Sequence, residues 1–131
     1  MMFFLRKLGH DKDIIEEIKK IAQKLDIKTG WFNAIGALKD LEYGFYDQEK
    51  KQYKKFLFKN PCEIVSCTGN ISLVNNEIFV HAHIAFSDEQ GILRGGHLFK
   101  GRIFACEVVI LPSIDILKRE FDEKTGLKLW K

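Results

Sequence analysis

One stretch near the start of the chain has the apolar spacing of an amphipathic helix. Its apolar residues recur at intervals of three or four and are Ile14, Ile15, Ile18, Ile21, Ala22 and Leu25. Residues at this spacing share one face of a helix, while the glutamates and lysines between them lie on the opposite face. Asp11 or Asp13 can cap the first turn through its carboxylate. We therefore predict one surface helix whose apolar face packs on a core.

Almost everything after this helix has the pattern of strands and turns. The predicted strands cover residues 31–38, 41–46, 51–58, 63–72, 78–86, 92–99, 103–111 and 115–121. Polar and glycine-containing stretches at 75–76 and 88–91, together with Gly101, supply turn residues between them. Many short strands and one helix predict an α+β fold, in which the main amphipathic helix packs on one face of a largely antiparallel sheet.

Length and composition indicate one folded domain that covers residues 1–131. Apolar residues make up 46% of the chain and charged residues 30%, close to the average for globular proteins. This composition excludes an intrinsically disordered chain, which could not bury enough apolar surface to offset the cost of ordering. The 11 phenylalanines supply an unusual number of large side chains for a core or an interface.

The charge and the cysteines restrict the partners and the compartment that we expect. The net charge is only +3 and both signs are interspersed, whereas a dedicated non-specific DNA binder gathers basic residues on one face. The three cysteines have no CxxC spacing, which predicts free thiols in a reducing compartment. The start of the chain lacks the features of a secretory signal, and no apolar run is long enough to span a bilayer. We therefore expect a soluble, cytoplasmic protein without membrane partners.

Three histidines form the strongest candidate for a chemical site. His81 and His83 lie two residues apart in an apolar strand and so project from the same face of the sheet. A turn follows, and the next strand returns with His97, which we expect to lie beside the pair. Three imidazoles are a known zinc-binding set that leaves one coordination position open for water, whose pKa the zinc ion lowers to about 7. The alternative is two hydrogen-bonded core histidines with a third in a glycine-rich turn, while His10 reads as a solvated loop residue.

Glu63 and Glu107 are candidate catalytic carboxylates because each sits within an apolar strand segment. A carboxylate in such a place is costly to bury without a partner. Either one could accept a hydrogen bond from a ligand histidine or act as a general base. The alternative is a residue on the solvent face of its strand, which we favour for Glu107.

A basic run interleaved with aromatic residues is the candidate nucleic-acid surface. Its lysines include Lys50, Lys51, Lys54 and Lys55. Lysines that follow a nucleic-acid backbone beside stacking aromatic rings are typical of single-strand binding. These lysines fall on both faces of the predicted strand, however, which favours a charged edge strand that discourages sheet-to-sheet pairing. The glycines before His97 do not have the spacing of a phosphate loop, so we expect them to allow a bulge or a close backbone approach.

Four segments carry a resemblance to a known family and together span most of the chain. They read GWFNAIGALKDLEYGFYD, EIVSCTGNISL, HAHIAFSDEQGILRGGHLFKGRIFACEVVI and FDEKTGLKLW. The combination of HAH in a strand, GGHL and a later EVVI resembles the PPC domain (plants and prokaryotes conserved). This domain is the globular part of plant AT-hook proteins and also occurs alone in bacteria and archaea.

The resemblance implies an α/β fold with a largely antiparallel sheet, assembled as a homotrimer. It also implies that His81, His83 and His97 are the conserved histidines of the family, through which some single-domain members are thought to bind zinc. Prokaryotic members are commonly described as DNA-binding proteins. The resemblance therefore favours a DNA-binding or regulatory module with a three-histidine metal site, of the single-domain prokaryotic type.

Two departures from the plant pattern weaken the expectation of DNA and protein partners. The chain lacks the Arg-Gly-Arg-Pro core of an AT-hook, so it has no arm of that kind to enter a minor groove. The plant hexapeptide Gly-Arg-Phe-Glu-Ile-Leu aligns with residues 60–65, where only Glu63 and Ile64 are identical.

The alternative function is a zinc-dependent enzyme of the hydrolase or lyase type that uses the three histidines and a nearby glutamate.

Overall fold

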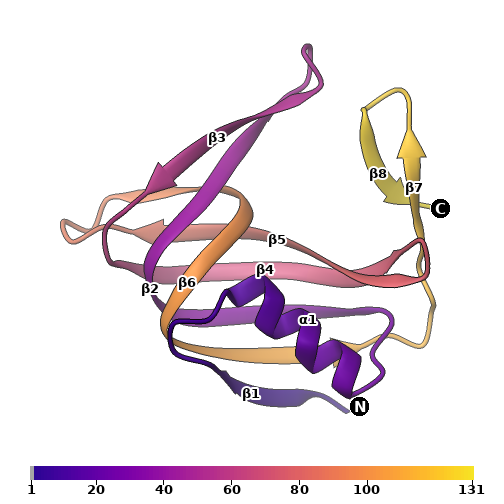
Figure 1. Ribbon diagram of the computed structural model, residues 1–131, viewed down its shortest axis with the longest axis horizontal. Helices are drawn as coiled ribbons and strands as arrows, with labels where there is room; N and C mark the ends of the chain where they lie inside the picture. The colour runs from indigo at the N-terminus through magenta and orange to yellow at the C-terminus, as the bar shows by residue number, and fades with distance from the viewer. Residues whose placement is uncertain (1) are drawn as a thin grey trace.

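Two long, bent strands organise the molecule, as the computed structural model of residues 2–131 shows (Figure 1). These strands are β2 (Gly30–Asp47) and β6 (Leu93–Pro112), which pair with each other over most of their length. The other elements are β1 (Phe4–Leu8), α1 (Ile14–Lys24), β3 (Gln52–Phe58), β4 (Cys62–Val74), β5 (Glu77–Ser87), β7 (Arg119–Asp122) and β8 (Leu127–Trp130).

The strand pairings close a circuit. β2 pairs with β4, β4 with β5, β5 with β6, and β6 again with β2, all antiparallel. β1 adds to the far edge of β6, and β3 extends the sheet beyond β2. Because β6 pairs first with β5 and then with β2, the sheet wraps around one interior and presents its other face outward.

The core fills the inside of this curved sheet. Alternate residues of the strands point inward, and the largest fully buried side chains include Phe32 of β2 and Phe86 of β5. Helix α1 contributes Ile14, Ile18 and Ala22, each without exposed surface. Asp13 caps the start of the helix, and its side chain accepts a hydrogen bond from the Glu16 backbone N–H. A helix this short is marginal in water by itself, so the burial of its apolar stripe supplies most of its stability.

The prediction of an α+β fold with a main amphipathic helix is wrong. The structure is mostly antiparallel β-sheet, with 65% of residues in strands and 8% in one short helix. The helix lies where the apolar spacing placed it, but it is a minor element. The predicted strands 31–38 and 41–46 are two halves of β2, and the strands 92–99 and 103–111 are two halves of β6. The polar residues between them lie near shifts of register, because β-bulges bend these strands without ending them.

The C-terminal segment forms a separate small hairpin. The predicted strand at 115–121 is displaced, because Ile114 and Asp115 form a bend, Lys118 forms an isolated bridge with Leu73, and β7 begins at Arg119. β7 and β8 pair with each other and rise on the same side of the molecule as the β2–β3 hairpin (Figure 1). The two hairpin ends meet: the Tyr46 hydroxyl donates to the Thr125 carbonyl at 2.7 Å, and the Lys51 ammonium donates to the Glu123 carbonyl at 2.8 Å. Within residues 2–131, no helix has the length and hydropathy of a membrane span.

Candidate metal centre

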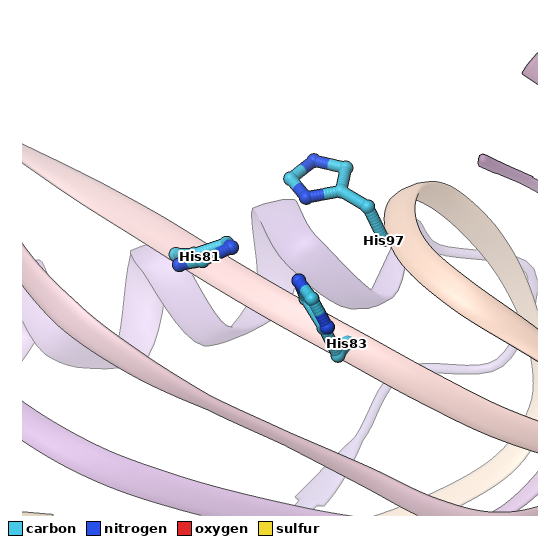
Figure 2. A group of neighbouring side chains, drawn as sticks. All are labelled: His81, His83 and His97. Atoms are coloured by element: carbon cyan, nitrogen blue, oxygen red, sulfur yellow. The ribbon is translucent and has the colours of Figure 1, made fainter. Parts of the chain in front are cut away.

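The three predicted histidines come together on the outer face of the sheet (Figure 2). The alternation of β5 sends Ala82 and Ile84 into the core and turns His81 and His83 outward. His97 projects from β6 toward the same point. One ring nitrogen from each histidine lies within 4.8 Å of the others, and the ring centroids are 5.1–5.6 Å apart.

Backbone register explains why His97 reaches the other two. His97 pairs with His83 of β5 and also with Gly44 of β2, so it stands where β6 exchanges one partner strand for the other. Gly96 makes this crossing possible, because its φ is 152° and a Cβ atom there would lie 2.3 Å from the Gly44 carbonyl oxygen. The glycines before His97 therefore serve close backbone approach, as their spacing predicted.

The surroundings keep two of the imidazoles neutral. Burial lowers the pKa of His81 to about 4, and the positive charges of Arg119 and His83 add to this effect. Burial also lowers the pKa of His97 to about 4, with further contributions from His81 and His83. Neutral imidazole is the form that binds a metal ion, so both side chains are ready to act as ligands at neutral pH.

Tyr53 is the polar neighbour of His97. Its hydroxyl lies 3.4 Å from His97 Nδ1, and the two rings are in contact with centroids 4.7 Å apart. Burial raises the pKa of Tyr53, with a smaller effect from Tyr46, so the phenol stays protonated at neutral pH. A hydroxyl at this position can hold the orientation and the tautomer of the ring.

Arg119 is the polar neighbour of His81 and comes from the C-terminal hairpin. Its Nε donates to the Ser72 hydroxyl at 2.9 Å, and one terminal nitrogen donates to the Asn70 carboxamide oxygen at 2.8 Å. The other terminal nitrogen donates to the Lys128 carbonyl at 2.9 Å. The guanidinium also lies over the rings of Phe79 and Trp130 and reaches to 3.5 Å from His81 Nδ1. These contacts attach the hairpin to the outer face of β4 and β5.

A cavity of about 650 Å³ lies in front of the histidines. Its walls come from β2, β3, β5, β6 and the C-terminal hairpin, and they include Phe45, Phe79, Leu127 and Leu129. The volume falls within the range of small-molecule sites. The two hairpins whose ends meet at Tyr46 and Thr125 therefore border a space that all three histidines line.

The predicted carboxylates lie elsewhere. Glu63 is exposed on β4 and pairs in register with Ala37 and Ser87. Glu107 is exposed on β6 opposite Lys7 of β1. Neither residue lines the histidine cavity. Both positions match the solvent-face alternative, because each side chain points away from the core that its strand neighbours fill.

The basic run lies on and beside the edge strand β3, which within residues 2–131 pairs with β2 alone. Lys50, Lys51, Lys54 and Lys55 are all exposed. Lys55 pairs with Glu42 at 3.6 Å and lies over the Phe99 ring, and Lys51 donates to the neighbouring hairpin. This arrangement fits a charged edge strand, and it also leaves several ammonium groups in solvent.

Tyr53 and Arg119 are the site residues that the sequence pattern missed. Tyr53 appeared only as an aromatic residue in a basic run, and Arg119 as a member of a predicted strand near the C-terminus. No spacing links either residue to a histidine, because 44 positions separate Tyr53 from His97 and 38 separate Arg119 from His81. Only the folding of two hairpins against the outer sheet face brings them together.

The donor set fits a divalent transition metal ion. Imidazole nitrogens suit zinc, copper, iron and nickel, and three of them leave a coordination position open. Ligand nitrogens at about 2.0 Å from a tetrahedral zinc ion would lie about 3.3 Å from one another. The ring nitrogens lie within 4.8 Å of one another, so side-chain rotation would have to bring them closer to reach that separation.

The family model described as the Plants and Prokaryotes Conserved (PCC) domain matches residues 1–114. A metal-containing protein from Archaeoglobus fulgidus is similar in structure, with 40% identity, a TM-score of 0.96, and coverage of 100% of this chain and 94% of that one. A plant- and prokaryote-conserved protein from Pyrococcus horikoshii has 35% identity, a TM-score of 0.93, and coverage of 100% and 92%. A candidate DNA-binding protein from Bacteroides thetaiotaomicron has 25% identity, a TM-score of 0.93, and coverage of 98% and 91%.

One curated relative also matches. The bifunctional protein GlmU from Synechococcus sp. (strain JA-3-3Ab) is 27% identical over 119 residues. The match covers 88% of this chain but only 18% of the relative. The chain thus spans less than a fifth of the length of that relative.

Proposed function

Because the chain belongs to the Plants and Prokaryotes Conserved (PCC) domain family, we propose that it is a regulatory binding module in which His81, His83 and His97 hold one zinc ion. The observation that carries this proposal is the convergence of three ring nitrogens within 4.8 Å on one sheet face. The similarity to a metal-containing protein at 40% identity supports it. When bound, a zinc ion with three imidazole ligands supplies Lewis acidity and one open coordination position.

Metal analysis of untagged protein tests this proposal. After purification without chelator and dialysis at neutral pH, we expect about one zinc ion per chain by mass spectrometry. A double His81→Ala/His83→Ala variant should lose the metal. His10→Ala is the matched control, because His10 contacts the Phe104 carbonyl in an exposed loop and lies outside the site. Wild-type protein without stoichiometric metal would refute the proposal.

We further propose that the module assembles as a homotrimer. The outer sheet face carries large exposed apolar side chains, among them Leu5, Trp31 and Ile35, each about half exposed or more. Exposed apolar groups of this size are typical of surfaces that a second copy covers. Sedimentation velocity at micromolar concentration should give a species of three chains, and a monomer would contradict the assembly.

DNA is the macromolecular partner that a similarity suggests, since a relative with 25% identity is a candidate DNA-binding protein. The surface that would contact phosphates contains Lys50, Lys51, Lys54 and Lys55. A trimer would present it three times, which multiplies a weak contact. Fluorescence anisotropy with a duplex should show affinity that falls steeply with salt and is weakened by Lys50→Glu/Lys54→Glu. No binding even at about 10 mM salt, where charges are only weakly screened, would exclude this function.

A zinc-dependent enzyme of the hydrolase or lyase type is the second candidate. The cavity of about 650 Å³ in front of the histidines favours it, because a small substrate would fit there. Among the described residues that line this cavity there is no carboxylate, so neither Glu63 nor Glu107 of the same chain would act as the base. Tyr53, which stays protonated, could position a substrate or donate a hydrogen bond to it.

A further inference from the structure

Arg119 carries a positive charge that no acidic side chain compensates in the described part of the chain. Its three hydrogen-bond acceptors within 3.0 Å are the Ser72 hydroxyl, the Asn70 carboxamide and the Lys128 carbonyl, all of them neutral. No aspartate or glutamate of residues 2–131 lies within 4.0 Å of its nitrogens. A partly buried cation without a counter-charge is costly, and that cost falls when an anion binds.

The cavity as a whole is cationic. Arg119 and Lys128 line it, and the lining residues that the structure describes include no carboxylate. Neutral histidines add no negative charge, and a zinc ion held by them would add two positive charges. The electrostatics of the cavity therefore favour an anion, whether or not the metal ion is bound, and favour it more strongly when it is.

Arg119 is also held in place and keeps one N–H group for a ligand. A guanidinium has five N–H groups, and three of them bind Ser72, Asn70 and Lys128. The second N–H of the nitrogen that binds Asn70 lies beside His81 Nδ1 at 3.5 Å, and one N–H remains on the other terminal nitrogen. The guanidinium also contacts the rings of Phe79 and Trp130, whose centroids lie 5.6 Å and 5.4 Å from its central carbon. An arginine positioned in this way loses little side-chain entropy when it binds a planar anion.

The walls indicate which class of anion fits. Phe45, Phe79, Leu127 and Leu129 make much of the cavity apolar. The one helix of residues 2–131 packs on β5 and β6 from the core side, so no helix N-terminus supplies the backbone donors that often bind phosphate. We propose that the histidine cavity binds a small organic acid, with Arg119 receiving its carboxylate and the apolar walls its carbon skeleton. This inference rests on the proposed function only in that a bound zinc ion would strengthen the attraction.

Calorimetric titration with phenylacetate tests the inference on the full chain loaded with zinc. Phenylacetate combines a carboxylate with an apolar body, and phenylacetamide is its neutral counterpart. We expect phenylacetate to bind, phenylacetamide to bind at least about tenfold more weakly, and Arg119→Gln to weaken phenylacetate binding by about 10- to 100-fold. Arg102→Gln is the matched control, since Arg102 pairs with Asp40 outside the cavity, and it should leave the affinity unchanged.

Arg119→Lys is a second variant that separates a loss of binding from a loss of folding. It keeps the positive charge and removes the planar guanidinium. We expect it to bind phenylacetate with an affinity between those of the wild type and Arg119→Gln. Unchanged affinity in Arg119→Gln, no binding by the wild type, or tighter binding of inorganic phosphate than of phenylacetate would each overturn the inference.

Zinc content measured on the same samples separates the two proposals. If the protein contains zinc but does not bind phenylacetate, the organic-acid inference is overturned and the proposed metal site is not affected. If no zinc is bound, the proposed function fails, and the same titration of the metal-free protein decides the inference. Arg119-dependent binding would then support it, and Arg119-independent binding or none would overturn it.

Discussion

His83 lies directly opposite His97 in the register of β5 and β6, with ring centroids 5.6 Å apart. This pairing occurs at the position where β6 leaves β5 and begins to pair with β2. The candidate metal centre is therefore built at a change of strand partner, where the backbone of β6 must bend. Substitutions that disturb this bend should disturb the metal centre as well.

Removing the metal ion should lower the stability of the folded chain. A ligand that binds only the native state at 100 times its dissociation constant contributes about 2.7 kcal/mol. For a domain of this length, we expect the melting temperature to fall by about 10 °C when EDTA is added. Calorimetry of zinc-loaded protein would measure the shift. His83→Ala should melt at the same temperature with and without EDTA, whereas His10→Ala should respond like the wild type.

Gly96→Ala should damage both the fold and the metal centre. The residue has a φ of 152°, and its new Cβ atom would meet the backbone oxygen of Gly44. We expect a loss of at least about 3 kcal/mol in the free energy of unfolding, and zinc content below that of the wild type. Gly91→Ala is the control, because Gly91 also has a positive φ but no atom within 4 Å of the new Cβ. Chemical denaturation should show a loss of only about 1 kcal/mol there, and equal losses would contradict a clash at Gly96.

Tyr53→Phe should weaken zinc binding without unfolding the chain. The hydroxyl lies 3.4 Å from His97 Nδ1, and partners of ligand histidines typically affect metal affinity by about 10- to 100-fold. Competition with a chromophoric chelator would measure the change. Tyr46→Phe is the matched control, because the Tyr46 hydroxyl donates to the Thr125 carbonyl and not to a histidine. Affinity unchanged in Tyr53→Phe would show that the phenol does not orient the ligand.

Cys67 should make stability fall with rising pH in the alkaline range. Burial raises the pKa of this thiol from about 9 to about 12, with a smaller effect from Cys106. Above pH 9 the unfolded chain loses the Cys67 proton while the folded chain keeps it, so the free energy of unfolding decreases as the pH rises toward 12. The decrease should reach about 1.4 kcal/mol by pH 10. Denaturation of wild type and Cys67→Ala at pH 8 and pH 10 isolates this contribution, and parallel pH profiles would contradict it.

The local parts of the structure were predictable from residue order. The apolar spacing from Ile14 to Leu25 located the helix, because apolar residues at intervals of three and four share one helical face. The alternation around His81 and His83 placed both side chains on one face, and the turn after β5 made the return of His97 beside them predictable. These relationships depend on neighbours in sequence or on one tight connection.

The balance between strand and helix, and the lengths of the two longest strands, were not predictable in the same way. Breaks in the apolar pattern at 39–40 and around Gly101 separated the predicted strands, yet β2 and β6 continue through them. A local pattern cannot distinguish a turn from a β-bulge, because the bulge is stabilised by the partner strand. Four of the eight predicted strands are therefore halves of two strands of 18 and 20 residues.

The sequence by itself determined the position of the helix and the shared face of the three histidines, because periodicity and a single turn dictate both. Only the tertiary structure decided the surroundings of these histidines. It brought Tyr53 and Arg119 to His97 and His81, and it placed Glu63 and Glu107 on exposed positions outside the cavity. Such contacts depend on how the β2–β3 and β7–β8 hairpins pack over the outer sheet face. The free energy of that packing is shared among residues far apart in the chain, and no local pattern records it.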